Sequence, residues 1–150
     1  MKHLFEAAVV EETKARILSL KATSTRQWGR MGAAQALAHC AVGLESAVGD
    51  RRPPRVFIGR FVGPLIKRLA IGDERPFRRN SPTSPEFVIA DPRDLAQEQA
   101  RLCALLDRFA AGGASACTTH PHSFFGPLAP HEWAVLMYKH LDHHLRQFGV

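Results

Sequence analysis

The sequence lacks a long uninterrupted hydrophobic run. A membrane-spanning helix needs about 20 consecutive apolar residues, but the longest candidate, residues 56–71, is interrupted by Pro64 and by three basic residues. The N-terminal residues are not expected to act as a secretory signal, because Glu6 follows soon after Met1 and no small-residue cleavage site is present. We therefore expect a cytoplasmic protein with no membrane partner.

Cysteine is also scarce. Cys40, Cys103 and Cys117 are odd in number and show no CxxC spacing, which favours free thiols in a reducing compartment over disulfide bridges. Cys40 lies in an apolar segment, where a thiol packs as a small hydrophobic group. The sequence assigns no chemical role to any of the three.

Acidic residues are fewer than basic ones. Fourteen Asp and Glu stand against 20 Lys and Arg, which gives a net charge of +6 and raises the chance of an anionic partner. The basic residues concentrate in residues 51–55, 67–68 and 75–79. No interleaved aromatic pattern of a nucleic-acid module accompanies them, so a solvated basic surface is the simpler interpretation and specific nucleic-acid binding is not expected.

The chain predicts one domain over residues 1–150, because its length is typical of a single domain. Apolar residues recur at spacings of three and four over residues 5–20, and alanine dominates residues 33–48, so both segments predict helices. Residues 56–71 predict a shorter helix kinked at Pro64. No alternating strand pattern is present apart from a weak one at residues 87–89.

Two further helices are expected in the second half. Asp91 and Pro92 provide a cap and a first helical residue, and Gly112 with Gly113 ends that helix. The last helix starts after Pro130 and runs to about Gln147. Residues 73–92 predict an extended crossover packed along the helices, anchored by two aromatic residues and fixed by four prolines: Phe77, Phe87, Pro76, Pro82, Pro85 and Pro92. The pattern predicts an all-α fold, an up-down four-helix bundle with a proline-rich crossover between its second and third main helices.

The last predicted helix carries an HxxxH pair. At about 100° per residue, His140 and His144 share one face with Trp133 and Met137, whereas the opposite face holds three polar residues, Lys139, Asp142 and Arg146. The two imidazoles therefore lie in the buried stripe, one turn apart, which is the spacing at which a helix offers two nitrogens to a single metal ion.

A third ligand is expected from His39, which lies in the alanine-rich helix among core residues. Metal sites in helical bundles are commonly built from facing helices, and three protein ligands leave a coordination position open. Two simpler interpretations stay open: His39 bonds a backbone carbonyl in the core, and the HxxxH spacing arises by chance in a chain with eight histidines.

Four more residues are candidates for the pocket around such a site. His143 lies at the edge of the buried stripe and Trp133 lies on the same face as the pair. His120 and His122 flank Pro121 in the preceding loop. They either contact substrate or metal at a pocket mouth or belong to a loop fixed by prolines, and the second interpretation is preferred.

Several stretches resemble the DinB/YfiT-like superfamily of metal-dependent enzymes, and within it an uncharacterised bacterial branch described as a domain of unknown function. They spread over nearly the whole chain and comprise residues 26–31 (RQWGRM), 35–40 (QALAHC), 80–83 (NSPT), 120–122 (HPH), 124–128 (FFGPL) and 139–149 (KHLDHHLRQFG). The match is partial, because His144 is followed by Leu-Arg-Gln where the superfamily often has Arg-Gly-Gln.

The resemblance implies a DinB-like four-helix bundle whose metal triad is His39, His140 and His144. It also implies activities of two kinds, namely transfer reactions that use a low-molecular-weight thiol and hydrolysis. The ligand types themselves favour zinc or nickel.

The leading hypothesis is therefore a metal-dependent enzyme, a transferase or hydrolase with a small-molecule substrate. One alternative is a non-enzymatic helical module that binds an anionic partner such as nucleic acid through its basic segments. The other is a structural metal. The sequence indicates neither the substrate nor the reaction, and it leaves a homodimer open.

Overall fold

The computed structural model describes residues 1–81, 83 and 87–150 of the chain. In this part the chain forms α-helices and one short 3-10 helix, and the only β pairing is an isolated bridge between His122 and Gly126. The elements are α1 (Ala7–Ser19), α2 (Ala33–Ala47), α3 (Gly59–Ile71), α4 (Leu95–Gly112), η2 (Gly113–Ala116) and α5 (Pro130–Gln147). The predicted all-α class is confirmed.

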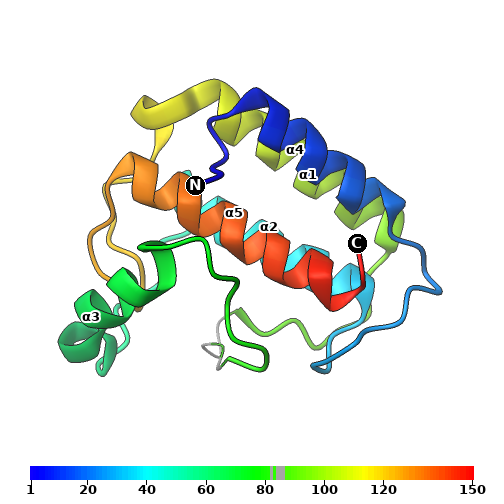
Figure 1. The fold of residues 1–150 in the computed structure, drawn as a ribbon, viewed down its shortest axis with the longest axis horizontal. Coiled ribbons are helices and arrows are strands. Elements are labelled where there is room, and N and C mark those ends of the chain that lie inside the picture. The colour runs from blue at the N-terminus through cyan, green and yellow to red at the C-terminus, as the bar shows by residue number, and fades with distance from the viewer. Residues whose placement is uncertain (82, 84–86) are drawn as a thin grey trace.

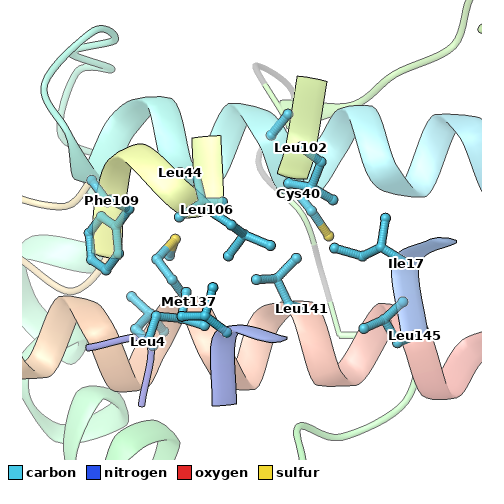
Figure 2. Close-up of a cluster of buried hydrophobic side chains, with 14 of the residues drawn as sticks. Leu4, Ile17, Cys40, Leu44, Leu102, Leu106, Phe109, Met137, Leu141 and Leu145 are labelled. Carbon is cyan, nitrogen blue, oxygen red and sulfur yellow. The ribbon is translucent and has the colours of Figure 1, made fainter. Parts of the chain in front are cut away.

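Four helices enclose the hydrophobic core. Figure 1 shows α1 lying along α4 and α5 lying along α2, and α2 also packs against α4 while α1 packs against α5. Leu44 from α2, Leu106 from α4 and Leu141 from α5 are almost fully buried between them, as Figure 2 shows. Truncating such a leucine to alanine typically costs about 2–5 kcal/mol. Cys40 lies in the same core, as expected, and its burial raises the pKa of its thiol.

Helix α2 supplies the most buried surface. Eleven of its 15 residues are buried, because alanine, glycine and leucine face helices on both sides. At its start, the side-chain oxygen of Gln35 accepts a hydrogen bond of 2.9 Å from the backbone N–H of Gly32. At its end, Gly49 adopts a positive φ of 85°, a conformation that side chains rarely tolerate and that terminates helices.

Four helix starts differ from the predictions, including that of α1, which begins at Ala7 instead of residue 5. Helix α4 begins at Leu95, not at Asp91, because the Asp94 side chain accepts a 2.8 Å hydrogen bond from the backbone N–H of Gln97 and so caps the helix. Helix α5 includes Pro130 as its first residue. Helix α3 begins at Gly59 instead of residue 56, and Pro64 lies inside it. The ends of all five helices lie within about a residue of the predicted positions.

The described part of the crossover between α3 and α4 lies below α5 in Figure 1. Phe77 is half-buried beside His143, and the Phe87 backbone contacts α2, so both expected anchors are in place. Two of the four crossover prolines, Pro82 and Pro85, lie outside the described residues. No described helix has both the length and the apolar character to cross a membrane.

The predicted solvent-facing side of α5 is wrong at Lys139. Its side chain is only 5% exposed, because the crossover covers it. The Lys139 ammonium donates a 2.8 Å hydrogen bond to the backbone oxygen of Asp73 and lies 5.4 Å from the centre of the Phe77 ring.

Asp142 is buried as well, for a different reason. Its carboxylate pairs with Arg16 of α1 at 2.9 Å and with Arg146 at 2.7 Å. Helix α1 therefore closes this side of α5. Of the three residues predicted to face solvent, only Arg146 is exposed.

Candidate metal centre

Three histidines meet where α2 faces α5. The Nε2 atoms of His39 and His140 are 2.8 Å apart, and the ring of His144 lies 4.8 Å from that of His39 and 5.0 Å from that of His140, measured between centroids. One nitrogen from each ring lies within 4.8 Å of the other two, so the group could hold one metal ion. The structure thus brings together the three histidines that the sequence selected, and metal binding itself stays a prediction.

Hydrogen bonds orient two of the rings. His39 Nδ1 lies 2.8 Å from the backbone oxygen of Phe87, and because a carbonyl only accepts, Nδ1 carries the proton. His144 Nδ1 lies 2.9 Å from Oε1 of Gln147, whose amide nitrogen donates to the backbone oxygen of Trp28 at 2.7 Å. That second bond fixes the orientation of the amide, so His144 Nδ1 is also a donor. Both rings therefore direct an unprotonated Nε2 inward, the tautomer that a metal ligand needs.

The third ring depends on a glycine. A Cβ atom at Gly43 of α2 would lie 3.1 Å from Nδ1 and 3.3 Å from Cε1 of His140, which is closer than most real contacts of this kind. The absence of a side chain at Gly43 therefore makes room for this imidazole. Because His39 Nε2 is an acceptor, the 2.8 Å contact is a hydrogen bond donated by His140 Nε2–H. For His140 to bind a cation through Nε2, this proton would have to move to Nδ1, which keeps the imidazole neutral.

Burial keeps the three imidazoles neutral. It lowers the pKa of His144 to about 3, with a further contribution from His39, and it lowers the pKa of His140 well below its usual value. Burial also lowers the pKa of His39, although the hydrogen bond to Phe87 opposes this. Metal binding requires neutral imidazole, so near pH 7 the site needs no deprotonation by the metal.

The group contains only imidazoles in the described part of the chain, with neither a carboxylate nor a thiolate. Three neutral ligands leave the full charge of a divalent ion uncompensated by the protein. Imidazole suits zinc, nickel, copper and iron, whereas magnesium and calcium prefer oxygen. The donor set therefore fits a transition metal ion.

His143 lies beside the triad, at the rim where it was expected. Its ring lies 5.0 Å from that of His144 and 5.7 Å from that of Trp28. It lines an open hollow of about 370 Å³, together with Gln27, Trp28, Pro76, Phe77, Arg79, Arg146, Gly149 and Val150. The Arg79 guanidinium lies 4.3 Å from the centre of the Trp28 ring. The buried Nε1 of Trp28 has no hydrogen-bond partner among the described residues.

The HPH histidines lie in a structured loop and do not join the triad. His122 Nδ1 accepts hydrogen bonds from the backbone N–H groups of Phe124 and Phe125, at 3.1 and 3.2 Å. His120 Nε2 bonds the backbone oxygen of Pro53 at 3.1 Å. Burial, followed by the charge of Arg55, lowers the pKa of His122 to about 4. The geometry supports the interpretation of a fixed loop.

The side of the site near this loop is nearly closed. The cavity that His120, His122 and Trp133 share with Ser46 and Phe87 has a volume of only about 10 Å³, room for roughly one water molecule. Trp133 is buried, and its ring lies 5.5 Å from that of His122. The larger hollow lies on the His143 side.

Sequence reasoning missed the residues around the triad. Gln147 could have been found, because it lies three residues after His144 on the same helix, within reach of its ring. Gly43 lies four residues after His39 but gives no sign of its role until His140 is placed opposite it. Arg79 could not have been found, since its contact with Trp28 joins two loops far apart in sequence.

A family model described as a protein of unknown function, DUF1569, matches residues 4–149. No curated protein and no solved structure matches the chain. The predicted membership of the DinB/YfiT-like superfamily is corrected by this family match. Three histidines at these positions specify a metal-site geometry, and such a geometry can arise in more than one family. The expected low-molecular-weight thiol rested on that resemblance alone and is withdrawn with it.

Proposed function

Because the chain belongs to the DUF1569 family, whose function is unknown, we propose a function from the site itself. His39, His140 and His144 bind one divalent transition-metal ion, with zinc or nickel as the best fit to the donor set. The protein is a metal-dependent enzyme that acts on a small molecule. The observation that carries this proposal is the pair of hydrogen bonds that hold His39 and His144 with Nδ1 protonated and Nε2 directed inward.

We also propose that α1, α2, α4 and α5 form an up-down four-helix bundle. The supporting observation is that α2 and α1 each pack against both α4 and α5. In such a bundle, α2 and α5 present their histidines to each other across a shared interface. Rigid helices hold ligands in place more accurately than loops do.

A metal held by His39, His140 and His144 would supply Lewis acidity and would lower the pKa of a bound water. The side chains of the 370 Å³ hollow would bind the substrate there. Arg79 offers a cationic group, and His143 lies next to a metal ligand with a titratable imidazole. This arrangement favours a small substrate with an anionic or acceptor-rich group and a hydrolytic or transfer reaction.

The proposal is tested by metal content. Native mass spectrometry of the purified protein should find about one divalent ion per chain, and replacing His144 with alanine should abolish it. His131→Ala is the matched control, because His131 is an exposed histidine at the other end of α5 and its loss should leave the metal in place. Tight binding that survives His144→Ala would refute the assignment.

A structural ion is the second candidate, because His39 and His144 are buried. The two candidates differ in what metal removal does. If the metal is catalytic, the hydrogen bonds from His39 to Phe87 and from His144 to Gln147 should hold the site, and cooperative unfolding should persist after chelation. If the metal is structural, chelation should abolish cooperative unfolding.

A further inference from the structure

Helix α3 exposes large apolar side chains to solvent. Phe61, Leu65 and Leu69 are 72%, 65% and 71% exposed, and they continue a stripe that begins at Phe57 and Ile58, also exposed. The spacing of three to four residues places Ile58, Phe61, Leu65 and Leu69 on one side of the helix. Contiguous apolar patches of this kind mark interaction sites on soluble proteins.

The opposite side of α3 is fixed to the body of the protein. A Cβ atom at Gly63 would lie 2.2 Å from the backbone oxygen of Phe124, and one at Gly59 would lie 2.6 Å from it. The side chain of Lys67 pairs with Glu132 of α5 at 2.9 Å. Helix α3 therefore cannot turn its apolar stripe inward without losing these contacts. Figure 1 shows α3 at one end of the molecule, away from α1 and α4.

The stripe lies in a strongly basic segment. Residues 51–72 contain six Lys and Arg residues and no Asp or Glu. Arg52, Arg60 and Arg68 are exposed and form no ion pair with the described residues. The surface thus combines an apolar stripe with unpaired positive charge.

A membrane surface satisfies both features better than a second copy of the chain or a nucleic acid does. A second copy of this chain would cover the apolar stripe but would bring the same cations to it, with no carboxylate from residues 51–72 to pair them. A nucleic acid would neutralise the cations and leave the apolar side chains against charged phosphates. A membrane surface containing anionic lipids accepts apolar side chains between its acyl chains and pairs cations with its headgroups.

We infer that α3 docks the protein on anionic lipid membranes, lying in the interface with Phe61, Leu65 and Leu69 inserted and Arg60 and Arg68 at headgroup level. Long arginine side chains reach the headgroups while their stems stay in apolar surroundings. This inference revises the expectation of no membrane partner, which rested on the absence of a spanning segment. It is independent of the metal site and of the proposed enzymatic activity.

Vesicle co-sedimentation of the full chain tests this inference. Vesicles of phosphatidylglycerol and phosphatidylcholine should bind the protein, and vesicles of phosphatidylcholine alone should bind it at least about tenfold more weakly. Phe61→Ser should weaken binding to the anionic vesicles about tenfold or more, because it removes a large inserted side chain. The matched control is Leu18→Ser on α1, which removes another strongly exposed apolar residue and should leave binding unchanged.

The charge contribution has its own pair of variants. Arg68→Glu should weaken binding to anionic vesicles about tenfold or more. Lys21→Glu makes an equal charge change at an exposed residue outside the α3 surface, and the factor by which it weakens binding should be less than half of that for Arg68→Glu. Circular dichroism confirms that each variant is folded. Three results would overturn the inference: no binding to anionic vesicles, equal loss with Leu18→Ser and Phe61→Ser, or a dimer that Phe61→Ser dissociates and that does not bind vesicles.

Discussion

The α2–α5 interface and the surface of α3 carry side chains in opposite kinds of unfavourable environment. Between α2 and α5, polar imidazoles are buried in the core, and 11 of the 15 residues of α2 are buried with them. On α3, large apolar side chains face solvent and only three of 13 residues are buried. Both placements cost free energy unless a ligand or partner compensates. The comparison therefore points to function at two separate places, an ion within the fold and a surface outside it.

The largest effect is expected for a change at the buried histidines between α2 and α5. Replacing His140 with alanine removes one of three ligands and should abolish stoichiometric metal binding, because two imidazoles rarely retain a divalent ion against competing water. Native mass spectrometry with added zinc measures the effect. An unchanged stoichiometry in His140→Ala would show that the ion, if bound, lies elsewhere.

The metal-free protein should lose stability in mild acid. Burial lowers the pKa of His122 to about 4 and that of His144 to about 3, whereas the unfolded imidazoles titrate near 6.5. The unfolded state therefore takes up more protons as the pH falls below about 6.5, so stability falls by about 1.4 kcal/mol per pH unit for each such histidine.

Urea unfolding between pH 7.5 and 4.5 measures this dependence. The curve should be flat above about pH 6.5 and fall below it, starting well above the range near pH 4 where carboxylates titrate. Equal stability at pH 6.5 and 4.5 would contradict the buried, neutral state of these histidines.

A change to the residue that holds His144 should have a smaller effect. Replacing Gln147 with leucine removes the acceptor that orients His144 and should weaken metal binding about 10- to 100-fold. Gln99→Leu is the matched control, because the amide of Gln99 bonds the backbone of α1 at Ile17 and Leu20, away from the triad. Titration calorimetry measures the metal affinity of both variants. Equal affinities would show that Gln147 does not support metal binding.

Gly43 offers a change of a single methyl group. Gly43→Ala should displace the His140 ring, because the added Cβ would lie 3.1 Å from Nδ1, and should weaken metal binding about tenfold. Gly32→Ala at the start of α2 is the control, since its Cβ would meet only Gln35 at an ordinary 3.7 Å. If Gly43→Ala binds as tightly as Gly32→Ala, the ring has room to move.

The smallest effect on stability is expected for a change on the exposed surface of α3. Leu65→Ser on α3 should change the free energy of unfolding by less than about 0.5 kcal/mol, as exposed substitutions usually do. Leu106→Ala in the core should cost about 2–5 kcal/mol. Chemical denaturation measures both. A large loss of stability with Leu65→Ser would mean that the stripe stabilises the fold and is not a free surface for an external partner.

The helices were predictable because their signals are local. The alanine-rich run of α2 and the periodic leucines of α4 encode helix without reference to the rest of the chain. The α4 start was misplaced because two caps compete within four residues. Asp91 precedes a proline, but Asp94 is the residue whose side chain reaches a free backbone N–H.

The candidate site was only partly predictable for a related reason. His140 and His144 share a helix face, so their spacing alone indicates a pair. The burial of Lys139 and Asp142 was not predictable, because it depends on the crossover and on Arg16 of α1, which a wheel drawn for α5 alone leaves out. The hollow beside His143 likewise depends on loops that meet only in three dimensions.

The most direct test of the central claim is anomalous X-ray diffraction from crystals of the zinc-loaded protein, recorded on both sides of the zinc absorption edge. The account predicts one strong anomalous peak per chain, between α2 and α5, bonded by one nitrogen from each of His39, His140 and His144. A peak bonded by other residues would contradict it. So would the absence of a peak in crystals where His39 and His140 still share their hydrogen bond.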